Sequence, residues 1–233
     1  MLLAELEIWH SRPIAPTRRV ALGRRVLPVE PAPGFGGLLL GGIVAAHIEA
    51  LDDDLDEELG RLLLDLEAGR RIPQPRLRHR FQLDRHGLAR SRHRLLGEGD
   101  ALEFEFESEG SPASQVLGAA YAAGQVDPAE RRIVMDVVRR GSRWRGAIGP
   151  ELVRYLSGVR GGSARAARAF ADPGLWALGV LGFDAGSSPV RGDVQRRFRS
   201  LLRDAHPDHG GARDGAADRI ADLAEARRIL MAT

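Results

Sequence analysis

The sequence contains no cysteine, and none of its 34 basic residues is a lysine. Without cysteine, the chain can form neither disulfides nor thiolate metal sites. Because every basic residue is an arginine, no basic side chain titrates near pH 10, which explains a calculated pI of 9.8 beside a formal net charge of only +2. The high pI is therefore weak support for nucleic-acid binding.

Aromatic residues and long apolar runs are also scarce. Aromatic side chains make up 5% of the sequence. The most apolar run, Phe35 to Ala46, is shorter than the ~20 residues that span a bilayer, and glycine interrupts it. Glu5 and Glu7 occupy the part of the N-terminus that would be basic in a signal peptide. We therefore expect a cytoplasmic protein without a membrane segment.

What the sequence does contain indicates a soluble α+β protein. Its 233 residues are 43% hydrophobic and 28% charged, and the length suits one large domain or two small ones. We expect a strand-rich α+β region over residues 1–108, a helical region over residues 109–170 and a separate helical domain over residues 171–233.

The first 48 or so residues are expected to be rich in strands. Residues 2–9 alternate apolar and polar side chains, as a half-buried strand does. The glycine-rich run at residues 34–42 invites comparison with a phosphate-binding loop, but it lacks the spacing and the lysine of such loops. We interpret it as a site of close backbone packing or as a strand-to-helix turn.

A predicted helix follows the acidic run Asp52-Asp53-Asp54. Gly69 is expected to end this helix. Its leucines recur on one face: Leu55, Leu59, Leu62, Leu63 and Leu66. The acidic run favours the positive end of the helix dipole, and its spacing does not match a calcium-binding loop. We therefore expect no metal site there.

Residues 71–108 combine a basic part with an acidic strand. We expect strands in RHRFQLD and HGLARSRHRLL, on either side of a turn near residues 85–87, and another in ALEFEFES. The basic part is Arg76, Arg78, Arg80, Arg85, Arg90, Arg92 and Arg94, and the acidic strand carries Glu103, Glu105 and Glu107. Cross-strand pairing of these charges is favoured over contact with RNA or DNA, since Phe81 is the one aromatic residue among the arginines.

Three helices are predicted beyond residue 110 from their start signals. Ser111-Pro112, Asp127-Pro128 and Gly149-Pro150 each combine a cap or turn residue with a proline in the first helical turn. Residues 158–169 are small and basic, and are expected to form a short helix or a linker. Asp172-Pro173 then caps a further helix.

The stretch Val194 to Gly211 is the most informative part of the chain. Val194, Phe198, Leu201, Leu202 and Ala205 recur on one side of a helix, with Arg196, Arg199 and Arg203 roughly opposite. His206-Pro207 ends the helix, and Asp208 and two glycines follow. Taken alone, His206 and Asp208 could act as a general acid and base, or His206 and His209 could bind a metal; a solvated helix-stop turn is favoured over both.

These residues resemble a J-domain, the co-chaperone module that acts on Hsp70. The family's His-Pro-Asp tripeptide stands here as His206-Pro207-Asp208, directly after a basic helix. Residues 175–184 look like the family's first helix, and residues 220–230 like its third. The family's usual Tyr of the second helix is Phe198, and Arg227 replaces a Tyr in the apolar stripe of the third helix, where it must reach out to solvent or lie at the edge of the helix pair.

The resemblance implies a three-helix J-domain over residues 171–233, in which helices II and III are antiparallel. It implies binding to a DnaK-type Hsp70 through His206, Pro207 and Asp208 and through Arg196, Arg197, Arg199 and Arg203, and stimulation of the ATPase of that chaperone. Phe198, Leu201, Leu223 and Leu230 would hold helices II and III together. The family module carries out no chemistry itself, so no catalytic residue and no cofactor are expected.

Residues 119–138, AAYAAGQVDPAERRIVMDVV, loosely resemble the TerB-like helical module, which precedes a C-terminal J-domain in one group of membrane-anchored chaperone proteins. Residues 1–170 would then recruit a client or set a location. Two alternatives stay open: an adaptor or scaffold whose J-like module binds without stimulating the chaperone, and an enzyme or RNA-binding protein that acts through its N-terminal region.

Overall fold

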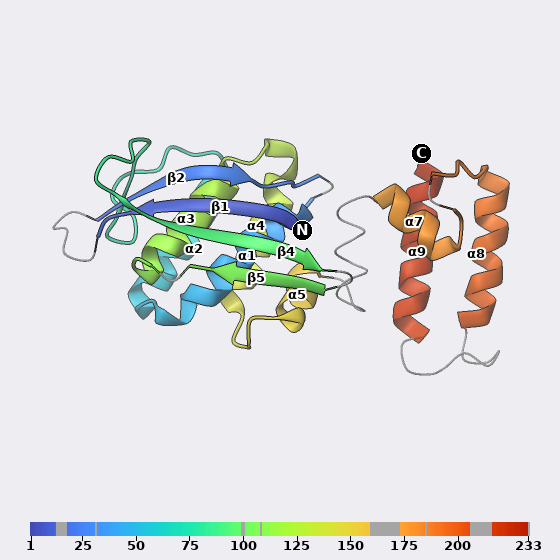
Figure 1. The fold of residues 1–233 in the computed structure, drawn as a ribbon. Helices are drawn as coiled ribbons and strands as arrows, with labels where there is room; N and C mark the ends of the chain where they lie inside the picture. Colours follow the sequence, from blue (N-terminus) through green and yellow to red (C-terminus); the bar gives the residue numbers. More distant parts are fainter. Residues whose placement is uncertain are drawn as a thin grey trace. The chain divides into compact units, whose positions relative to one another are not determined.

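The computed structural model (Figure 1) describes residues 1–12, 18–30, 32–98, 101–107, 109–158, 173–184, 186–205 and 216–232. The chain forms two compact units, here called unit 1 (Met1–Gly158) and unit 2 (Val159–Thr233). The overall class is α+β, as expected from the sequence. Unit 1 takes in the strand-rich region and the described part of the helical region that follows it.

Unit 1 is built on a five-stranded mixed sheet with the order β3-β2-β1-β4-β5. All neighbouring strands are antiparallel except β2 and β3, which are parallel. The strands are β1 (Leu2–His10), β2 (Arg19–Val26), β3 (Arg80–Phe81), β4 (Ala89–Glu98) and β5 (Ala101–Phe106).

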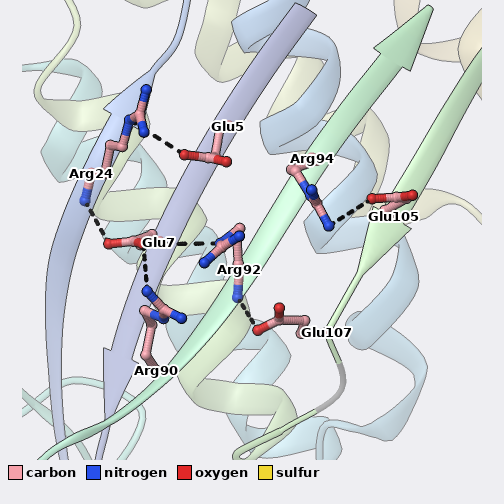
Figure 2. Close-up of polar contacts among 8 residues, drawn as sticks. All are labelled: Glu5, Glu7, Arg24, Arg90, Arg92, Arg94, Glu105 and Glu107. Atoms are coloured by element: carbon pink, nitrogen blue, oxygen red, sulfur yellow. Dashed lines mark hydrogen bonds and ion pairs between the residues drawn. The ribbon is translucent and has the colours of Figure 1, made fainter. Parts of the chain in front are cut away.

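The central strand β1 follows the alternation predicted from its sequence. Ala4, Leu6 and Ile8 are fully buried against helices. Glu5 and Glu7 point to the opposite face of the sheet, where they meet arginines of the neighbouring strands (Figure 2). The period of two therefore separates the core face of the sheet from a charged face.

The helices of unit 1 cover one face of the sheet (Figure 1). α1 and α3 pack against the strands, and α4 packs on α1. The elements are α1 (Gly34–His47), a 3₁₀ turn (Ile48–Ala50), α2 (Asp53–Glu67), α3 (Pro112–Gly124), α4 (Pro128–Arg143) and α5 (Pro150–Ser157).

The expectation of strand-rich structure up to residue 48 is wrong for residues 34–47, which form the helix α1. Every residue from Gly34 to Ala45 is buried, so the sequence shows no polar face that would reveal a helical period. The interpretation of close backbone packing is right. A Cβ on Gly141 of α4 would lie 2.2 Å from the carbonyl oxygen of Gly41, so the two helices meet backbone to backbone.

The strands expected on either side of the turn near residues 85–87 also need correction. Only Arg80 and Phe81 of RHRFQLD form a strand, and this β3 pairs with β2 at the far edge of the sheet rather than with β4. The turn itself is present, with Gly87 at a φ of +70°. A strand of two residues is too short for an alternation of apolar and polar side chains to show which strand it pairs with.

The other helix signals of unit 1 are confirmed. The five leucines of the α2 stripe are buried, and Gly69, just beyond the helix, has a φ of +65°. The side chains of Ser111 and Asp127 cap α3 and α4 by accepting hydrogen bonds from the backbone N–H groups of Ser114 and Ala129. No helix in the described ranges is both long enough and apolar enough to cross a membrane.

Unit 2 contains the helices α7 (Pro173–Leu181), α8 (Arg191–Ala205) and α9 (Ala216–Ala232). Both α7 and α8 pack on α9, and Figure 1 shows α8 and α9 side by side, running in opposite directions. The core of this unit is formed by six buried side chains from all three helices: Ala177, Val180, Leu181, Val194, Leu223 and Ala226. The segment 158–169, expected to be a short helix or a linker, lies outside the described residues from position 159 onward, as does Asp172.

Candidate functional site

The loop residues of the predicted chaperone-binding site, His206, Pro207 and Asp208, lie outside the described residues. The described part of the site is α8, which ends at Ala205, directly before them. The side chains that α8 exposes are therefore the described part of the predicted site.

α8 separates its apolar and basic side chains onto different faces. Val194 is fully buried, and Phe198, Leu201 and Ala205 pack against the core of unit 2. Arg196, Arg199 and Arg203 are exposed. Together these three arginines, here called the arginine face, form the stripe that the spacing predicts.

Local contacts hold only part of the arginine face. Arg196 forms an ion pair with Asp193 one turn earlier, and Arg199 donates a hydrogen bond of 3.4 Å to the side chain of Gln195. Arg203, the arginine closest to the loop, has no polar partner among the described residues. Exposed i, i+3 and i, i+4 contacts of this kind are weak, so a partner protein can replace them at little cost.

Arg197 differs from the other three arginines. Its Nε donates a hydrogen bond of 3.0 Å to the carbonyl oxygen of Leu181, the last residue of α7. Its guanidinium also lies beside Gly182, whose φ of +70° ends α7. Arg197 therefore ties the end of α7 to α8, a structural contact that its position in the sequence did not reveal.

The side chains expected to hold the last two helices together all lie in the core of unit 2. Leu223 is fully buried, and Phe198, Leu201 and Leu230 pack against the same core. Arg227 of α9, expected at the edge of the helix pair, lies with its guanidinium carbon 5.0 Å from the centre of the Phe198 ring. The cation covers the aromatic face and remains exposed, so Arg227 lies at the edge of the helix pair without entering the core.

The arginines of β4 lie on the charged face of the sheet, where glutamates surround them (Figure 2). Arg94 lies 2.9 Å from a carboxylate oxygen of Glu105 on β5, which confirms the predicted pairing across these strands. The carboxylate of Glu7 on β1 lies 3.1 Å from Arg90 and 4.0 Å from Arg92. The same carboxylate accepts a hydrogen bond of 3.1 Å from the backbone N–H of residue 24.

Glu7 is therefore the centre of a charge network that joins the three middle strands of the sheet. Its side chain is 11% exposed, so the arginines largely cover it. A carboxylate this buried requires compensation by cations and hydrogen bonds, and the three contacts supply it. The positive charge of β4 is mostly neutralised within the sheet, which disfavours this face as a nucleic-acid surface.

The helical side of the same sheet contains a buried polar network that the sequence did not suggest. Nε2 of His10 lies 2.9 Å from Oγ of Ser91, and this hydroxyl donates to the backbone carbonyl of Glu109. The amide nitrogen of Gln115 donates to the same hydroxyl and the same carbonyl, at 3.0 and 2.5 Å. Nε2 of His93 lies 2.8 Å from the amide oxygen of Gln115.

These contacts fix which ring nitrogen of His93 carries the hydrogen of its neutral form. The amide nitrogen of Gln115 has two acceptors, so its oxygen faces His93, and Nε2 of the imidazole must donate. Nδ1 is buried and has no hydrogen-bond partner among the described residues. Burial lowers the pKa of His93 to about 4, and the hydrogen bond to Gln115 only partly opposes this effect.

Two further histidines are held neutral by burial. Desolvation lowers the pKa of His47, whose ring packs edge-on against His93 at 5.8 Å, and the pKa of His79, which hydrogen-bonds the carbonyl of Leu77. The partners in this network lie up to 81 residues apart in the sequence, so no local motif connects them. Although His10 lies beside the Ser91 hydroxyl, both side chains are buried, and we interpret the network as part of the core.

The acidic run before α2 is engaged by an arginine. Arg78 lies 3.5 Å from a carboxylate oxygen of Asp52 and 2.9 Å from one of Asp54. This contact adds a charge partner to the dipole role that the sequence predicts for the run.

Comparisons of the chain with protein-family models, with curated proteins and with solved structures find no match.

Proposed function

We propose that the protein is a J-domain co-chaperone, which binds a DnaK-type Hsp70 through unit 2 and stimulates its ATP hydrolysis. The observation that carries the proposal is the exposed arginine face of α8, which leads directly into His206-Pro207-Asp208. The proposal includes a cytoplasmic location, where ATP and the partner chaperone are present. Residues 1–170 would direct the protein to a client or a location.

The arginine face and the loop residues that follow it each have a role in this proposal. The arginine face would attract an acidic surface of the chaperone and speed the encounter. Asp208 would pair with an arginine of the chaperone, and Pro207 would stiffen the loop. Binding would stimulate hydrolysis only if the module prefers one chaperone state over the other, which shifts the population toward the hydrolysing state.

The primary test is single-turnover ATP hydrolysis by DnaK with the full-length protein added. We expect the wild-type protein to accelerate hydrolysis and His206→Gln to abolish the acceleration. An absence of stimulation by the wild-type protein would remove the co-chaperone proposal, and binding without stimulation would indicate an adaptor instead. Stimulation that survives His206→Gln would remove the loop from the mechanism.

A pair of charge reversals on α8 tests the arginine face itself. Arg199→Glu should weaken stimulation, and raising the salt concentration should reduce the difference from the wild-type protein. Arg191→Glu, at the exposed start of the same helix, makes the same charge change outside the face and should stimulate normally. Equal loss in both variants would show that net charge, rather than the face, controls the encounter.

A further inference from the structure

β5 forms one edge of the sheet in unit 1 (Figure 1). It pairs with β4 along one side, and no strand of the described chain pairs with its other side. An edge strand presents unpaired backbone N–H and C=O groups that another extended chain can pair with. The side chains of β5 decide what kind of chain this would be.

The register of β4 and β5 identifies the backbone groups that face outward. The backbone N–H of Glu107 bonds the carbonyl of Arg92 at 3.1 Å, so residue 107 points its backbone groups toward β4. In an antiparallel pair this direction alternates from one residue to the next. Leu102, Phe104 and Phe106 therefore point their N–H and C=O groups to the open side, where the described chain offers them no hydrogen-bond partner.

The two faces of β5 have opposite chemical character. Leu102, Phe104 and Phe106 lie on the helical face and are half-buried. Phe106 packs against the ring of His93 at 5.6 Å, and Phe104 lies against the backbone of α1 at Gly42. The opposite face carries the three glutamates of β5.

Those glutamates are only partly used within the chain. Glu105 has Arg94 as its ion-pair partner, and Glu107 accepts a hydrogen bond from the backbone N–H of Arg92 at 2.8 Å (Figure 2). Glu103 is exposed and has no ion pair among the described residues. The open side of β5 thus combines an uncompensated negative charge with an apolar stripe on the other face.

β4 shows which sequence pattern complements β5. Arg94 lies opposite Glu105 on the charged face, and Leu95 lies opposite Phe104 on the helical face. A strand added on the open side would also lie beside the glutamates of β5 on the charged face and beside its apolar side chains on the helical face. The complement is therefore basic residues on one face and apolar residues on the other.

We propose that the open edge of β5 is a docking site for an extended polypeptide segment in which basic and apolar residues alternate. The segment adds to the sheet as an antiparallel sixth strand, with its basic residues beside the glutamates and its apolar residues beside Leu102, Phe104 and Phe106. In this register the apolar residues exchange backbone hydrogen bonds with β5. The inference concerns unit 1 alone and does not depend on the proposed co-chaperone function.

A second copy of this chain is a poor occupant of the same edge. Antiparallel pairing of two β5 strands would place the glutamates of one copy directly opposite those of the other, and like charges in these positions destabilise the pair. The charge of the edge therefore selects against self-association and for a basic segment.

The test uses the full-length protein and a short fluorescein-labelled peptide of alternating arginine and valine, with binding measured by fluorescence anisotropy. The control peptide has the same composition, with its arginines in one block and its valines in another. We expect the alternating peptide to bind at least tenfold more tightly than the block peptide. Equal binding of the two would overturn the proposal, because charge attraction alone would then explain it.

Two N-methylated peptides test the backbone pairing. Methylation of the valine amides removes the donors that face β5, whereas methylation of the arginine amides removes donors that face away from it. We expect only the first change to abolish binding. Hydrogen exchange should also slow at the amides of Leu102, Phe104 and Phe106 when the unmodified peptide binds. Equal effects of the two methylation patterns would exclude strand addition.

The matched protein variants are Glu103→Arg and Glu57→Arg. The first reverses the exposed charge of the edge, and the second makes the same change on α2, where Glu57 has only an exposed pair with Arg61. Replacing cross-strand attraction by repulsion should weaken peptide binding about five- to tenfold in Glu103→Arg, with no change in Glu57→Arg. Absence of peptide binding to the wild-type protein, or occupation of the edge by a second copy in light scattering, would refute the proposal.

Discussion

Acidification from pH 7 to pH 5 should destabilise unit 1 through the buried imidazole of His93. The side chain is fully buried, its Nε2 donates to Gln115, and its Nδ1 has no partner among the described residues. A second proton would have to enter at this buried Nδ1, which has no acceptor among the described residues, in a ring packed against His47 and Phe106. The folded protein therefore holds this histidine neutral.

The size of the effect follows from the pKa of about 4 in the folded protein and an ordinary value of 6.5 in the unfolded chain. As the pH falls below 6.5, the unfolded chain binds a proton that the folded protein does not. The contribution of His93 is thus fully present above pH 6.5 and is lost as the pH falls toward 4. Linkage gives a loss of about 2 kcal/mol at pH 5. His47 and His79, whose pKa values are also lowered by burial, act in the same direction.

Urea unfolding at pH 5, 6, 7 and 8 measures this loss. In a Trp176→Phe background, the fluorescence of Trp9 and Trp144 reports on unit 1 alone. His93→Gln keeps a donor that can reach Gln115 and removes the titrating group, so its stability should change by about 2 kcal/mol less between pH 7 and pH 5 than that of the unsubstituted protein.

The reasoning about His93 fails if the variant and the reference protein show the same pH dependence. It also fails if the His93 ring resonance in an NMR titration of the folded protein moves with a midpoint near 6.5. A titration in the folded state at that pH would mean that Nδ1 reaches an acceptor.

Two further pairs of variants test packing. Gly141→Ala should destabilise unit 1 by about 1–3 kcal/mol in urea unfolding, because its Cβ would overlap the carbonyl of Gly41. Gly60→Ala, in a helix with open space around it, should stabilise the unit by up to about 1 kcal/mol. Equal shifts in the two variants would contradict the close crossing of α1 and α4. Arg197→Ala should lower the stability of unit 2 by about 1 kcal/mol, because it removes the hydrogen bond to α7. Arg196→Ala should change this stability by less than about 0.5 kcal/mol, since the ion pair of Arg196 is exposed. Thermal unfolding followed by circular dichroism distinguishes the two variants.

The elements that could be predicted from the sequence are those with one buried face and clear end signals. α2 and α8 carry their apolar residues at helical spacing, and β1 alternates, so each pattern reports directly on burial. Ser111 and Asp127 fixed two helix starts because their side chains satisfy specific backbone donors. In these cases local chemistry and tertiary packing favour the same structure.

The elements that could not be predicted are those defined by distant partners. α1 is buried on all sides, and its glycines, poor helix formers, are favoured by the close approach of α4. β3 is a strand only because residues 80 and 81 pair with β2. The polar network around His93 joins β1, β4 and the start of α3, and its members look like ordinary polar residues of amphipathic elements.

The candidate site shows the same division. The arginine face of α8 could be predicted, since three arginines at helical spacing opposite an apolar stripe must face outward. The contact of Arg197 with the end of α7 could not, because it depends on how two helices cross. The open edge of β5 could not be predicted either, because it depends on the strand order, which no local pattern in residues 101–107 specifies.

The position of β1 in the middle of the sheet has a consequence for biosynthesis. β1 needs β2 on one side and β4, more than 80 residues later in the chain, on the other. Its apolar side chains also await α3, so unit 1 stays unfinished until most of it has been translated. Unit 2 closes over short chain separations and should complete its fold much faster after its own synthesis. Until β4 has been made, the nascent chain leaves one edge of β1 and its apolar side chains uncovered, and deletion of β4 should turn this transient state into a permanent one.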